Sequence, residues 1–397
     1  MKDGWTSREV GEICQFSTGL WKGQRPPFAR VGVIRNTNFN KDGGLDYSDV
    51  AYLDVEVAKL EKRRLRLGDI ILEKSGGGPK QAVGRVALFD RASGDFSFSN
   101  FTASLRILDA NEVDYRYLHK FLYWTYLSGA TEGMQSHSTG IRNLDGDAYK
   151  AIRVAYPPVS EQRRLVDRID DVLGAIETVR RNVLANLRRA EELLERRRSV
   201  ILSARNPGWV ESRLGDLCHI SSRLVDPRED PYADLIHVGA GNIESGTGKL
   251  SGLMTARQEK LISGKFVFDQ TMVLYSKIRP YLRKVARPDF TGVCSADIYP
   301  LSPLEGRMNR DYLFHLLMSR EFTTYAMAGS ARAGMPKVNR EHLFDLGVWV
   351  PTVEQQARDA ADLDALADAF THHSSLCSRK LGLLREMKHS VLHEAFN

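Results

Sequence analysis

The chain repeats itself, and this duplication constrains its fold more than any other feature. The segment GWTSREVGEICQFSTGL begins at residue 4, and GWVESRLGDLCHISSRL begins at residue 208. Identical residues at the single offset of 204 include Trp5 with Trp209, Gly11 with Gly215, and Cys14 with Cys218. A chain of 397 residues with such a repeat has room for two similar domains.

The matches continue in the same order along almost the whole chain. They are Asn38-Phe39 with Asn242-Ile243, RLGDIILEKSGG (66–77) with FVFDQTMVLYSK (266–277), Tyr117-Leu118 with Tyr312-Leu313, and Glu161-Gln162 with Glu354-Gln355. In the second of these matches Asp69 stands opposite Asp269. Because the order is kept, the sequence predicts that one structural unit is built twice.

Each repeat predicts a globular part followed by a long helix. DIILEK and TMVLYSK are typical of strands, and YRYLHKFLYWTYLSG has the spacing of a buried helix. Residues at alternating spacings of four and three then predict a coiled-coil seam in each long helix. They are Leu165, Ile169, Val172, Ile176, Val179, Val183, Ala190 and Leu193 in the first helix, and Leu363, Leu366, Phe370, His373, Cys377, Leu384, Met387 and Val391 in the second.

Charge favours antiparallel pairing of the two helices, since each begins acidic and ends basic. We therefore predict an α+β protein: two repeated globular α/β domains separated by two long helices that form an antiparallel coiled coil with pseudo-twofold symmetry. The predicted boundaries are residues 1–160 for the first domain, 161–206 for a central helix, 207–353 for the second domain and 354–397 for a distal helix.

Each junction between strand and helix carries proline, which ends a strand, and then Glu-Gln. Ser160 is the predicted N-cap of the first helix, and the acidic residues complement the helix dipole. Taken alone, Glu-Gln is most simply a helix start.

Composition limits the classes of function. The net charge of +6 and pI near 9.0 permit a nucleic-acid partner. The four cysteines lie far apart, which argues against a zinc site or a disulfide framework. No metal or other cofactor is expected. The absence of a long apolar run or a signal-like N-terminus favours a cytoplasmic protein that does not enter a membrane.

Two globular halves, each closed by Pro-x-x-Glu-Gln before a long helix, resemble the specificity subunit of type I restriction-modification systems. The stretches GDIILEKSGG, YSKIRPYLRKVA (275–286) and PPVSEQRRLVDRI are also similar to that family. The second repeat departs mildly, with Pro-Thr-Val-Glu-Gln at its junction and Phe268-Asp269 in place of Gly-Asp.

The resemblance implies that each half is a target recognition domain for one part of a split site in double-stranded DNA. It also implies that the helices are a spacer and a docking surface for two methyltransferase subunits, within a complex that includes restriction and translocation subunits. The chain itself would have no catalytic residues. We expect the docking surface to include Glu161, Gln162, Glu354 and Gln355.

Phosphate contacts need Lys and Arg, and base reading needs polar side chains on elements that reach a groove. Three places in each repeat qualify. The first place comprises Lys74, Lys80 and Arg85, with Lys277, Arg279, Tyr281, Arg283 and Lys284 in the second repeat. The second comprises His137, Ser138, Thr139, Arg142 and Asn143, with Arg332, Lys337 and Asn339 in the second repeat. The third is VIRNTNFN (33–40), where Arg35, Asn36 and Asn38 are candidates, with HVGAGNI (237–243) in the second repeat. The simpler alternative for each place is a solvated surface loop.

Two other functions stay open at this point. A catalytic DNA enzyme would use the methyltransferase-like NPGW (206–209) or the acidic residues of DIILEK, although the second repeat lacks the second acid. A protein-binding scaffold without DNA contact would use the coiled coil alone. Basic loops at equivalent places in both repeats favour DNA recognition over either alternative.

Overall fold

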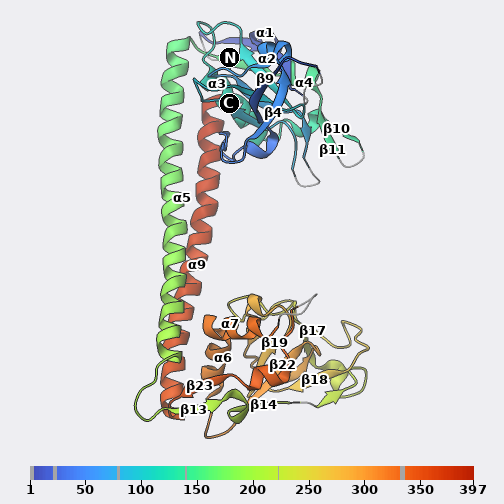
Figure 1. Ribbon diagram of the computed structural model, residues 1–397, viewed down its shortest axis with the longest axis vertical. Coiled ribbons are helices and arrows are strands. Elements are labelled where there is room, and N and C mark those ends of the chain that lie inside the picture. Colours follow the sequence, from blue (N-terminus) through green and yellow to red (C-terminus); the bar gives the residue numbers. More distant parts are fainter. Residues whose placement is uncertain (1–3, 21–24, 78–80, 139–140, 222, 331–335) are drawn as a thin grey trace. The chain divides into compact units, whose positions relative to one another are not determined.

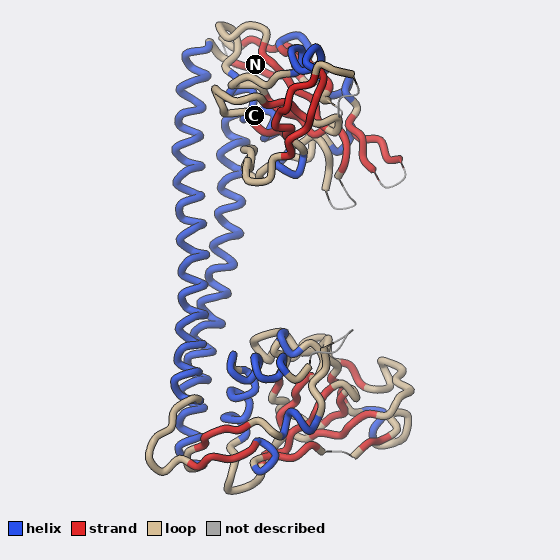
Figure 2. The backbone as a smooth tube through the Cα atoms, viewed as in Figure 1, coloured by secondary structure: helices blue, strands red, loops and turns tan. Residues whose placement is uncertain are grey.

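The computed structural model describes residues 4–20, 25–77, 81–138, 141–221, 223–330 and 336–397. It divides into two compact units. Unit 1 comprises Met1–Asn182 with Arg379–Asn397, and unit 2 comprises Val183–Ser378. Each unit combines a strand-rich globular part with portions of the two long helices (Figures 1 and 2).

Unit 1 is built on a four-stranded antiparallel sheet in the order β2-β9-β5-β7. Its strands are β2 (Cys14–Thr18), β9 (Thr102–Ile107), β5 (Ile70–Glu73) and β7 (Val86–Leu88). A second sheet has the order β4-β3-β8, with β4 (Ala51–Glu56), β3 (Phe28–Ile34) and β8 (Phe96–Phe98). In this sheet β3 runs antiparallel to β4 and parallel to β8.

Unit 2 repeats both sheets. Its four-stranded sheet has the order β14-β22-β19-β20, with β14 (Cys218–Ile220), β22 (Ile298–Pro303), β19 (Val273–Ser276) and β20 (Val285–Ala286). The second sheet has the order β15-β18-β21-β16-β17, with β15 (Leu224–Val225), β18 (Lys265–Phe268), β21 (Gly292–Cys294), β16 (Ile236–Val238) and β17 (Met254–Thr255). Again one pair, β16 with β21, is parallel and sits beside an antiparallel neighbour. The predicted duplication of the α+β fold is therefore confirmed.

A two-stranded ribbon leads into the long helix of each unit. It joins β1 (Thr6–Glu9) to β12 (Arg153–Tyr156) in unit 1 and β13 (Val210–Arg213) to β23 (Gly347–Val350) in unit 2. Unit 1 also has a small sheet of β10 (Gln135–Ser138), β11 (Ile141–Leu144) and β6 (Ser75–Gly76).

Short helices complete the units. Unit 1 contains α1 (Val10–Ile13), α2 (Val57–Arg63), α3 (Tyr115–Leu127) and α4 (Gly146–Lys150), with 3-10 turns η1 (Asn36–Asn38) and η2 (Glu132–Met134). Unit 2 contains α6 (Arg310–Met318), α7 (Arg320–Ala328) and α8 (Arg340–Phe344), with η3 (Leu214–Asp216), η4 (Tyr232–Asp234) and η5 (Pro280–Leu282).

The predicted buried helix appears as α3 in unit 1 and α6 in unit 2. Asp114 and Asn309 cap these helices by accepting hydrogen bonds from backbone N–H groups of the first turn. Tyr117 and Tyr312 are fully buried in the cores of their units, which explains why this pair recurs in the sequence.

The long helices α5 (Val159–Leu202) and α9 (Val353–Phe396) each contain 44 residues and begin at the same place in their repeats. The first helix begins before Ser160, so the predicted N-cap at Ser160 is wrong. Gln162 lies in its first turn, accepts a hydrogen bond from Asp114 N and donates to the carbonyls of Glu112 and Pro157.

The side chain that matches Gln162 in unit 2 is Gln356. It accepts from Asn309 N and donates to the carbonyls of Arg307 and Pro351, with oxygen and nitrogen distances of 2.8–3.0 Å. The predicted match of Glu161-Gln162 with Glu354-Gln355 is therefore wrong by one residue. The buried hydrogen bonds align Glu161-Gln162 with Gln355-Gln356.

The predicted seam is partly correct. Ile169, Ile176 and Val183 are buried, but Val172, Leu193 and Met387 are 42, 60 and 51% exposed. Val166, Leu194 and Leu392 are buried instead. Apolar residues lie on more than one stripe of each helix, so periodicity alone could not decide which stripe faces inward.

The two helices pack in opposite directions within each unit. In unit 1, Leu392 near the end of α9 shares a core cluster with Val166 and Ile169 near the start of α5. In unit 2, Arg197 near the end of α5 pairs with Asp362 near the start of α9 at 3.7 Å. None of the described helices combines the length and apolar character that a membrane span needs.

Candidate nucleic-acid interface

The first two predicted DNA-contact places meet in unit 1. Strand β6 pairs with β11, so that Gly76 stands opposite Arg142 and Ser75 opposite Asn143. The Ser75 hydroxyl donates to Asn143 Oδ1 at 2.6 Å. The loop after β5 and the hairpin before the last strand therefore form one continuous surface feature.

The same two places meet in unit 2 by the same kind of pairing. Ile278 bridges Lys337, Val338 N donates to Lys277 O at 2.9 Å, and Arg279 N donates to Pro336 O at 3.0 Å. These segments are far apart in the sequence, and the backbone contacts place them side by side.

The third predicted place joins them in both units. In unit 1 the Asn36 side chain donates to Glu73 Oε1 at 3.1 Å, which brings η1 against the end of β5. In unit 2 the Lys284 ammonium donates to Ala240 O, in the segment that follows β16. Each unit therefore gathers all three candidate segments.

Several predicted contact residues of unit 1 are used inside the domain. Arg85 forms two hydrogen bonds to Glu73, at 2.7 and 2.9 Å, and Glu73 is only 1% exposed. Asn38 is buried, accepts from Arg35 N and donates to the carbonyls of Asp46 and Asp49. Arg35 itself donates to Asp49. These partners assign the three side chains to holding the loops in place.

Three predicted residues of unit 2 also have internal partners. Lys277 donates to Ala296 O and lies 5.0 Å from the centre of the Tyr299 ring. Arg283 pairs with Glu195 of α5 at 2.9 Å. Asn339 caps α8 by accepting from His342 N at 2.7 Å.

Other side chains at the same place point outward. Arg279 is exposed, Tyr281 is 51% exposed, and the Lys337 side chain is 55% exposed although it approaches Asp297 at 3.7 Å. Arg340 was not among the predicted contacts, yet it is exposed next to Asn339 and lies over the Tyr299 ring. Its position in the basic stretch PKVNR is the signal that could have identified it.

The unit 1 surface offers Lys74, Arg142 and Asn143, which are all half-buried. Arg142 donates to Gln135 Oε1 at 3.3 Å across the β10–β11 hairpin. Lys80, Thr139 and Arg332 lie outside the residues that the structure describes, as do the side chains of His137 and Ser138.

The predicted docking residues differ in burial. Glu161 and Glu354 are exposed on the first turns of α5 and α9, and Gln355 donates to Asp359 at 2.8 Å. Gln162 is fully buried and holds the junction together. The two exposed carboxylates therefore offer a partner the most surface, the half-buried Gln355 offers less, and Gln162 offers none.

The acidic residues of DIILEK are each paired with an arginine. Asp69 accepts two hydrogen bonds from Arg106, at 2.7 and 2.6 Å, and Glu73 accepts two from Arg85. Carboxylates held in this way stabilise the sheet rather than bind a catalytic metal ion. The predicted match of Asp69 with Asp269 is wrong. Lys74 directly follows β5 and Lys277 directly follows β19, so these two residues match. Asp69 directly precedes Ile70, the first residue of β5, whereas Asp269 lies further from Val273, the first residue of β19.

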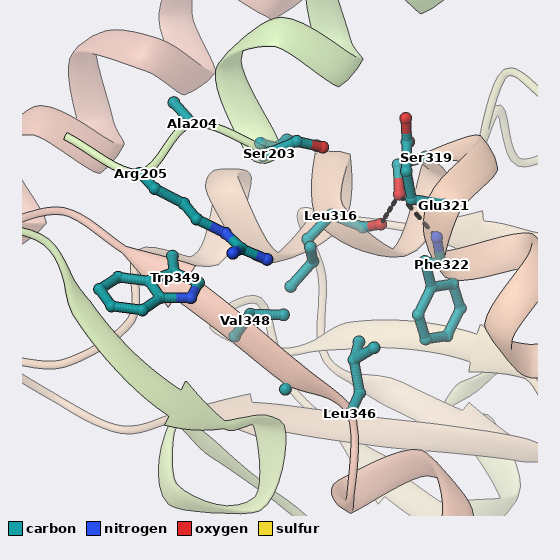
Figure 3. Close-up of a pocket in the computed structure, with 12 residues that line it drawn as sticks. Ser203, Ala204, Arg205, Leu316, Ser319, Glu321, Phe322, Leu346, Val348 and Trp349 are labelled. Carbon is teal, nitrogen blue, oxygen red and sulfur yellow. Dashed lines mark hydrogen bonds between the residues drawn. The ribbon is translucent and has the colours of Figure 1, made fainter.

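The NPGW segment is a turn between α5 and β13, with Trp209 N donating to Asn206 O at 3.1 Å. Figure 3 shows the adjoining hollow of unit 2, about 180 Å³ in volume. Its walls combine aliphatic side chains with the aromatic rings of Phe322 and Trp349 and with the polar or charged side chains of Ser203, Arg205, Ser319 and Glu321. The Ser319 hydroxyl donates to Leu316 O and accepts from Phe322 N, so its hydrogen bonds are used within the fold. This arrangement is typical of a joint between elements and not of a methyltransferase site.

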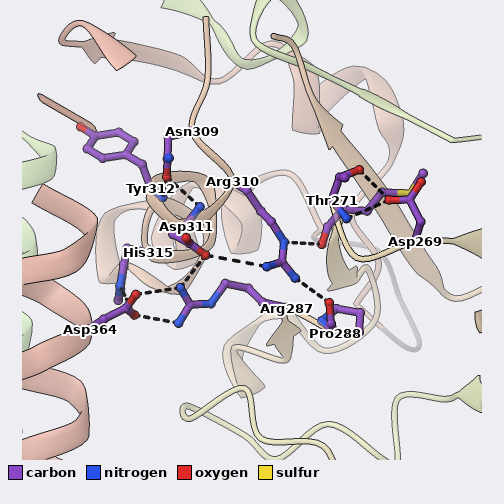
Figure 4. A network of polar contacts seen from close by, with 11 residues as sticks. Asp269, Thr271, Arg287, Pro288, Asn309, Arg310, Asp311, Tyr312, His315 and Asp364 are labelled. Atoms are coloured by element: carbon purple, nitrogen blue, oxygen red, sulfur yellow. Dashed lines mark hydrogen bonds and ion pairs between the residues drawn. The ribbon is translucent and has the colours of Figure 1, made fainter. Parts of the chain in front are cut away.

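A carboxylate on each long helix pairs with basic side chains in the globular part of its unit. In unit 2, Asp364 of α9 accepts from His315 at 2.9 Å and from Arg287 at 2.7 and 2.9 Å (Figure 4). Burial alone would raise the pKa of Asp364, but these hydrogen bonds outweigh burial and lower its pKa. In unit 1, Asp170 of α5 pairs with Lys120 and Arg116 in the same way.

Known proteins resemble this chain in sequence. A family model for the type I restriction modification DNA specificity domain matches residues 2–186 and 206–375. The specificity subunit of the type I restriction enzyme EcoDI from Escherichia coli is 27% identical over 77% of this chain and 76% of its own length. The StySPI specificity subunit from Salmonella potsdam is 22% identical over the whole chain and 89% of its own length.

Two solved structures have a similar fold. One comes from a study of complex assembly and conformational transition in the type I R-M system. The match covers all of this chain and 98% of the other chain, with a TM-score of 0.75 and 16% sequence identity. The HsdS subunit from Thermoanaerobacter tengcongensis covers the whole chain and 97% of its own with a TM-score of 0.57 and 17% identity.

Proposed function

The chain belongs to the type I restriction modification DNA specificity family, and we propose that it reads a two-part DNA target. It is a specificity subunit of a type I restriction-modification complex, a role that is recognition and not catalysis. Unit 1 would read one half-site and unit 2 the other.

One observation carries the proposal. In both units the segment after the central strand, β5 or β19, is paired by its backbone to the segment that precedes the last strand. Basic and polar side chains gather at this pairing, as phosphate and base contacts require. A scaffold that only bound protein would have no reason to repeat such a surface twice.

The two half-sites should differ in sequence because the two surfaces differ. Unit 2 presents Arg279, Tyr281, Lys337 and Arg340, whereas unit 1 presents Lys74, Arg142 and Asn143. Arginine pairs best with guanine and asparagine with adenine. We therefore propose an asymmetric target.

The long helices would provide the spacing and the partner surface. We propose domains at residues 1–160 and 207–353, separated by helical segments 161–206 and 354–397, with the length of the helices setting the gap between half-sites. Glu161 and Glu354, exposed at the starts of α5 and α9, would lie at docking sites for two methyltransferase subunits. Restriction and translocation subunits would join through that complex.

Methylation mapping tests the proposal directly. Genomic DNA would be sequenced from cells that express this chain with its methyltransferase partner and from cells that lack the chain. We expect methylation at a split motif, two short defined stretches with a fixed unspecified gap. A continuous motif would contradict the two-reader proposal, and methylation that does not depend on this chain would favour a scaffold.

A further inference from the structure

A buried carboxylate on α5 contacts three arginines of unit 2. Glu195 is 7% exposed and lies 2.5 Å from Arg198, 2.9 Å from Arg283 and 3.4 Å from Arg320. Arg198 belongs to the same helix and Arg320 begins α7. Arg283 alone comes from the loop between β19 and β20, which carries the candidate DNA contacts Arg279 and Tyr281.

That loop has an unusual backbone. Arg279 has φ 50° and ψ 60°, Arg283 has φ 47° and ψ 52°, and the short turn η5 lies between them. The left-handed region is unfavourable for any residue with a side chain, and most loops place glycine or asparagine there. Strained backbone of this kind persists only where surrounding contacts hold it.

Besides the backbone bond from Arg279 N to Pro336 O, several contacts that hold this loop involve Arg283. Its guanidinium contacts Glu195 and approaches Met318 O at 3.5 Å, while its own carbonyl accepts from Gly246 N at 3.3 Å. The matching residue of unit 1 is Gly84, which takes φ 103° without needing an anchor for a side chain. An arginine at this position is explained if its side chain is needed to fix the loop.

We propose that Glu195 is a positioning residue for DNA reading. Through Arg283 it fixes the loop 279–284 on α5, so that Arg279 and Tyr281 face the DNA in one orientation. This inference rests on the proposed function of unit 2, because it assumes that the loop contacts DNA.

Hydrogen exchange in the free, full-length chain tests, without DNA, whether Glu195 fixes the loop 279–284. In Glu195→Gln the amides of Gly246, Leu282 and Arg283 should exchange at least about tenfold faster, because the loop opens more often. Arg283→Gln should do the same and, with a partly exposed side chain, leaves the buried Glu195–Arg198 pair in place. Unchanged exchange of these amides in both variants would overturn the proposal.

Arg320→Gln is the matched control. Its guanidinium also contacts Glu195, but its side chain is 59% exposed and it is not part of the loop. Exchange of the loop amides should stay at the wild-type rate. If Arg320→Gln accelerated exchange as much as Arg283→Gln, Glu195 would have a general structural role and no specific action on the loop.

Selection from a pool of randomised duplexes tests the DNA-reading part. Glu195→Gln and Arg283→Gln should each weaken base preference in one half of the selected motif by about 5- to 10-fold, the lower range for one bidentate contact. The double variant should be no weaker than either single variant, because both changes break one link. Additive losses, or equal losses in both halves, would overturn the proposal.

Arg279→Ala distinguishes DNA reading by the loop from the positioning role of Glu195. If it relaxes the same half of the motif but Glu195→Gln does not, the loop reads DNA and the positioning role of Glu195 is wrong. If Arg279→Ala relaxes neither half, the proposed function of the loop is wrong, whatever the exchange rates show. Relaxation of the same half in both variants, with fast exchange only in Glu195→Gln, is the expected result.

Discussion

Units 1 and 2 build the same hairpin with different chemistry. The buried Glu73 at the end of β5 pairs with the half-buried Arg85 just before β7 in unit 1, whereas Ser276 and Lys284 occupy the matching positions of unit 2. Unit 1 turns its chain with glycine at residue 84, and unit 2 turns it with Arg283. The basic residues of the two loops therefore have different roles. In unit 1, Arg85 neutralises a buried carboxylate within the sheet. In unit 2, Arg283 ties the loop to α5, and Arg279 is exposed.

The largest expected difference concerns the buried pair. Arg85→Ala should destabilise unit 1 by about 3–5 kcal/mol, because Glu73 would be left as a buried carboxylate without a countercharge. Urea unfolding followed by hydrogen exchange of peptides from each unit would measure the loss.

Lys284→Ala is the matched control in unit 2. Its ammonium contacts only a carbonyl among the described residues, so we expect a loss of about 1–2 kcal/mol. Equal losses in the two variants would show that the hairpins are stabilised in the same way.

Substitution of the junction glutamines tests which residues of the two repeats match. Gln356→Ala should cost unit 2 about 3 kcal/mol, because three buried hydrogen bonds are lost and Asn309 N is left without a partner. Gln162→Ala should cost unit 1 a similar amount. Gln355→Ala, in the adjacent position, should cost less than about 1 kcal/mol. Reversed losses for Gln355 and Gln356 would restore the alignment predicted from the sequence.

Acid stability should depend on a histidine that only unit 1 has at its position. Burial, aided by the nearby charge of Lys120, lowers the pKa of His119 to about 3. The folded state thus holds the imidazole neutral, while the unfolded state binds a proton below about pH 6.5. Stability is complete above that pH and is lost progressively as the pH falls toward the folded-state pKa.

His119→Phe introduces the residue that Phe314 supplies at the matching position of unit 2. It should remove about 2 kcal/mol of the loss that unit 1 suffers between pH 7 and pH 5. Unfolding of wild type and variant at both pH values measures the difference. An unchanged pH dependence would mean that folding does not lower the pKa of His119.

The smallest expected effect is that of Arg279→Gly, which should raise the stability of unit 2 but weaken DNA recognition. Arg279→Gly should stabilise unit 2 by about 0.5–1 kcal/mol, because glycine adopts φ 50° without the steric cost of a side chain. DNA preference at one half-site should weaken at the same time. A variant that lost stability would show that Arg279 has a structural contact.

Much of the fold was predictable from the sequence. The repeat predicted two similar α+β units, and the apolar patterns predicted β5, β19, α3 and both long helices. The three candidate segments of each repeat were also predicted, and the structure brings them together. These features follow from periodicity and from local turn chemistry, which depend on residues that are close together in the sequence.

The remaining features depend on partners that are distant in the sequence. Gln355 and Gln356 are the same amino acid, and only the hydrogen bonds to Asn309 and Arg307 distinguish them. Arg85 and Arg283 look alike as loop cations, but Glu73 and Glu195 determine what each one does. Burial of a charge against one particular carboxylate cannot be read from composition or spacing.

Methylation mapping with the Arg279→Ala variant beside wild type would show whether unit 2 reads its own half-site. We expect one half of a split motif to become relaxed while the other half and the gap between them stay unchanged. Relaxation of both halves, or of neither, would contradict the claim that unit 2 reads its own half-site through this loop.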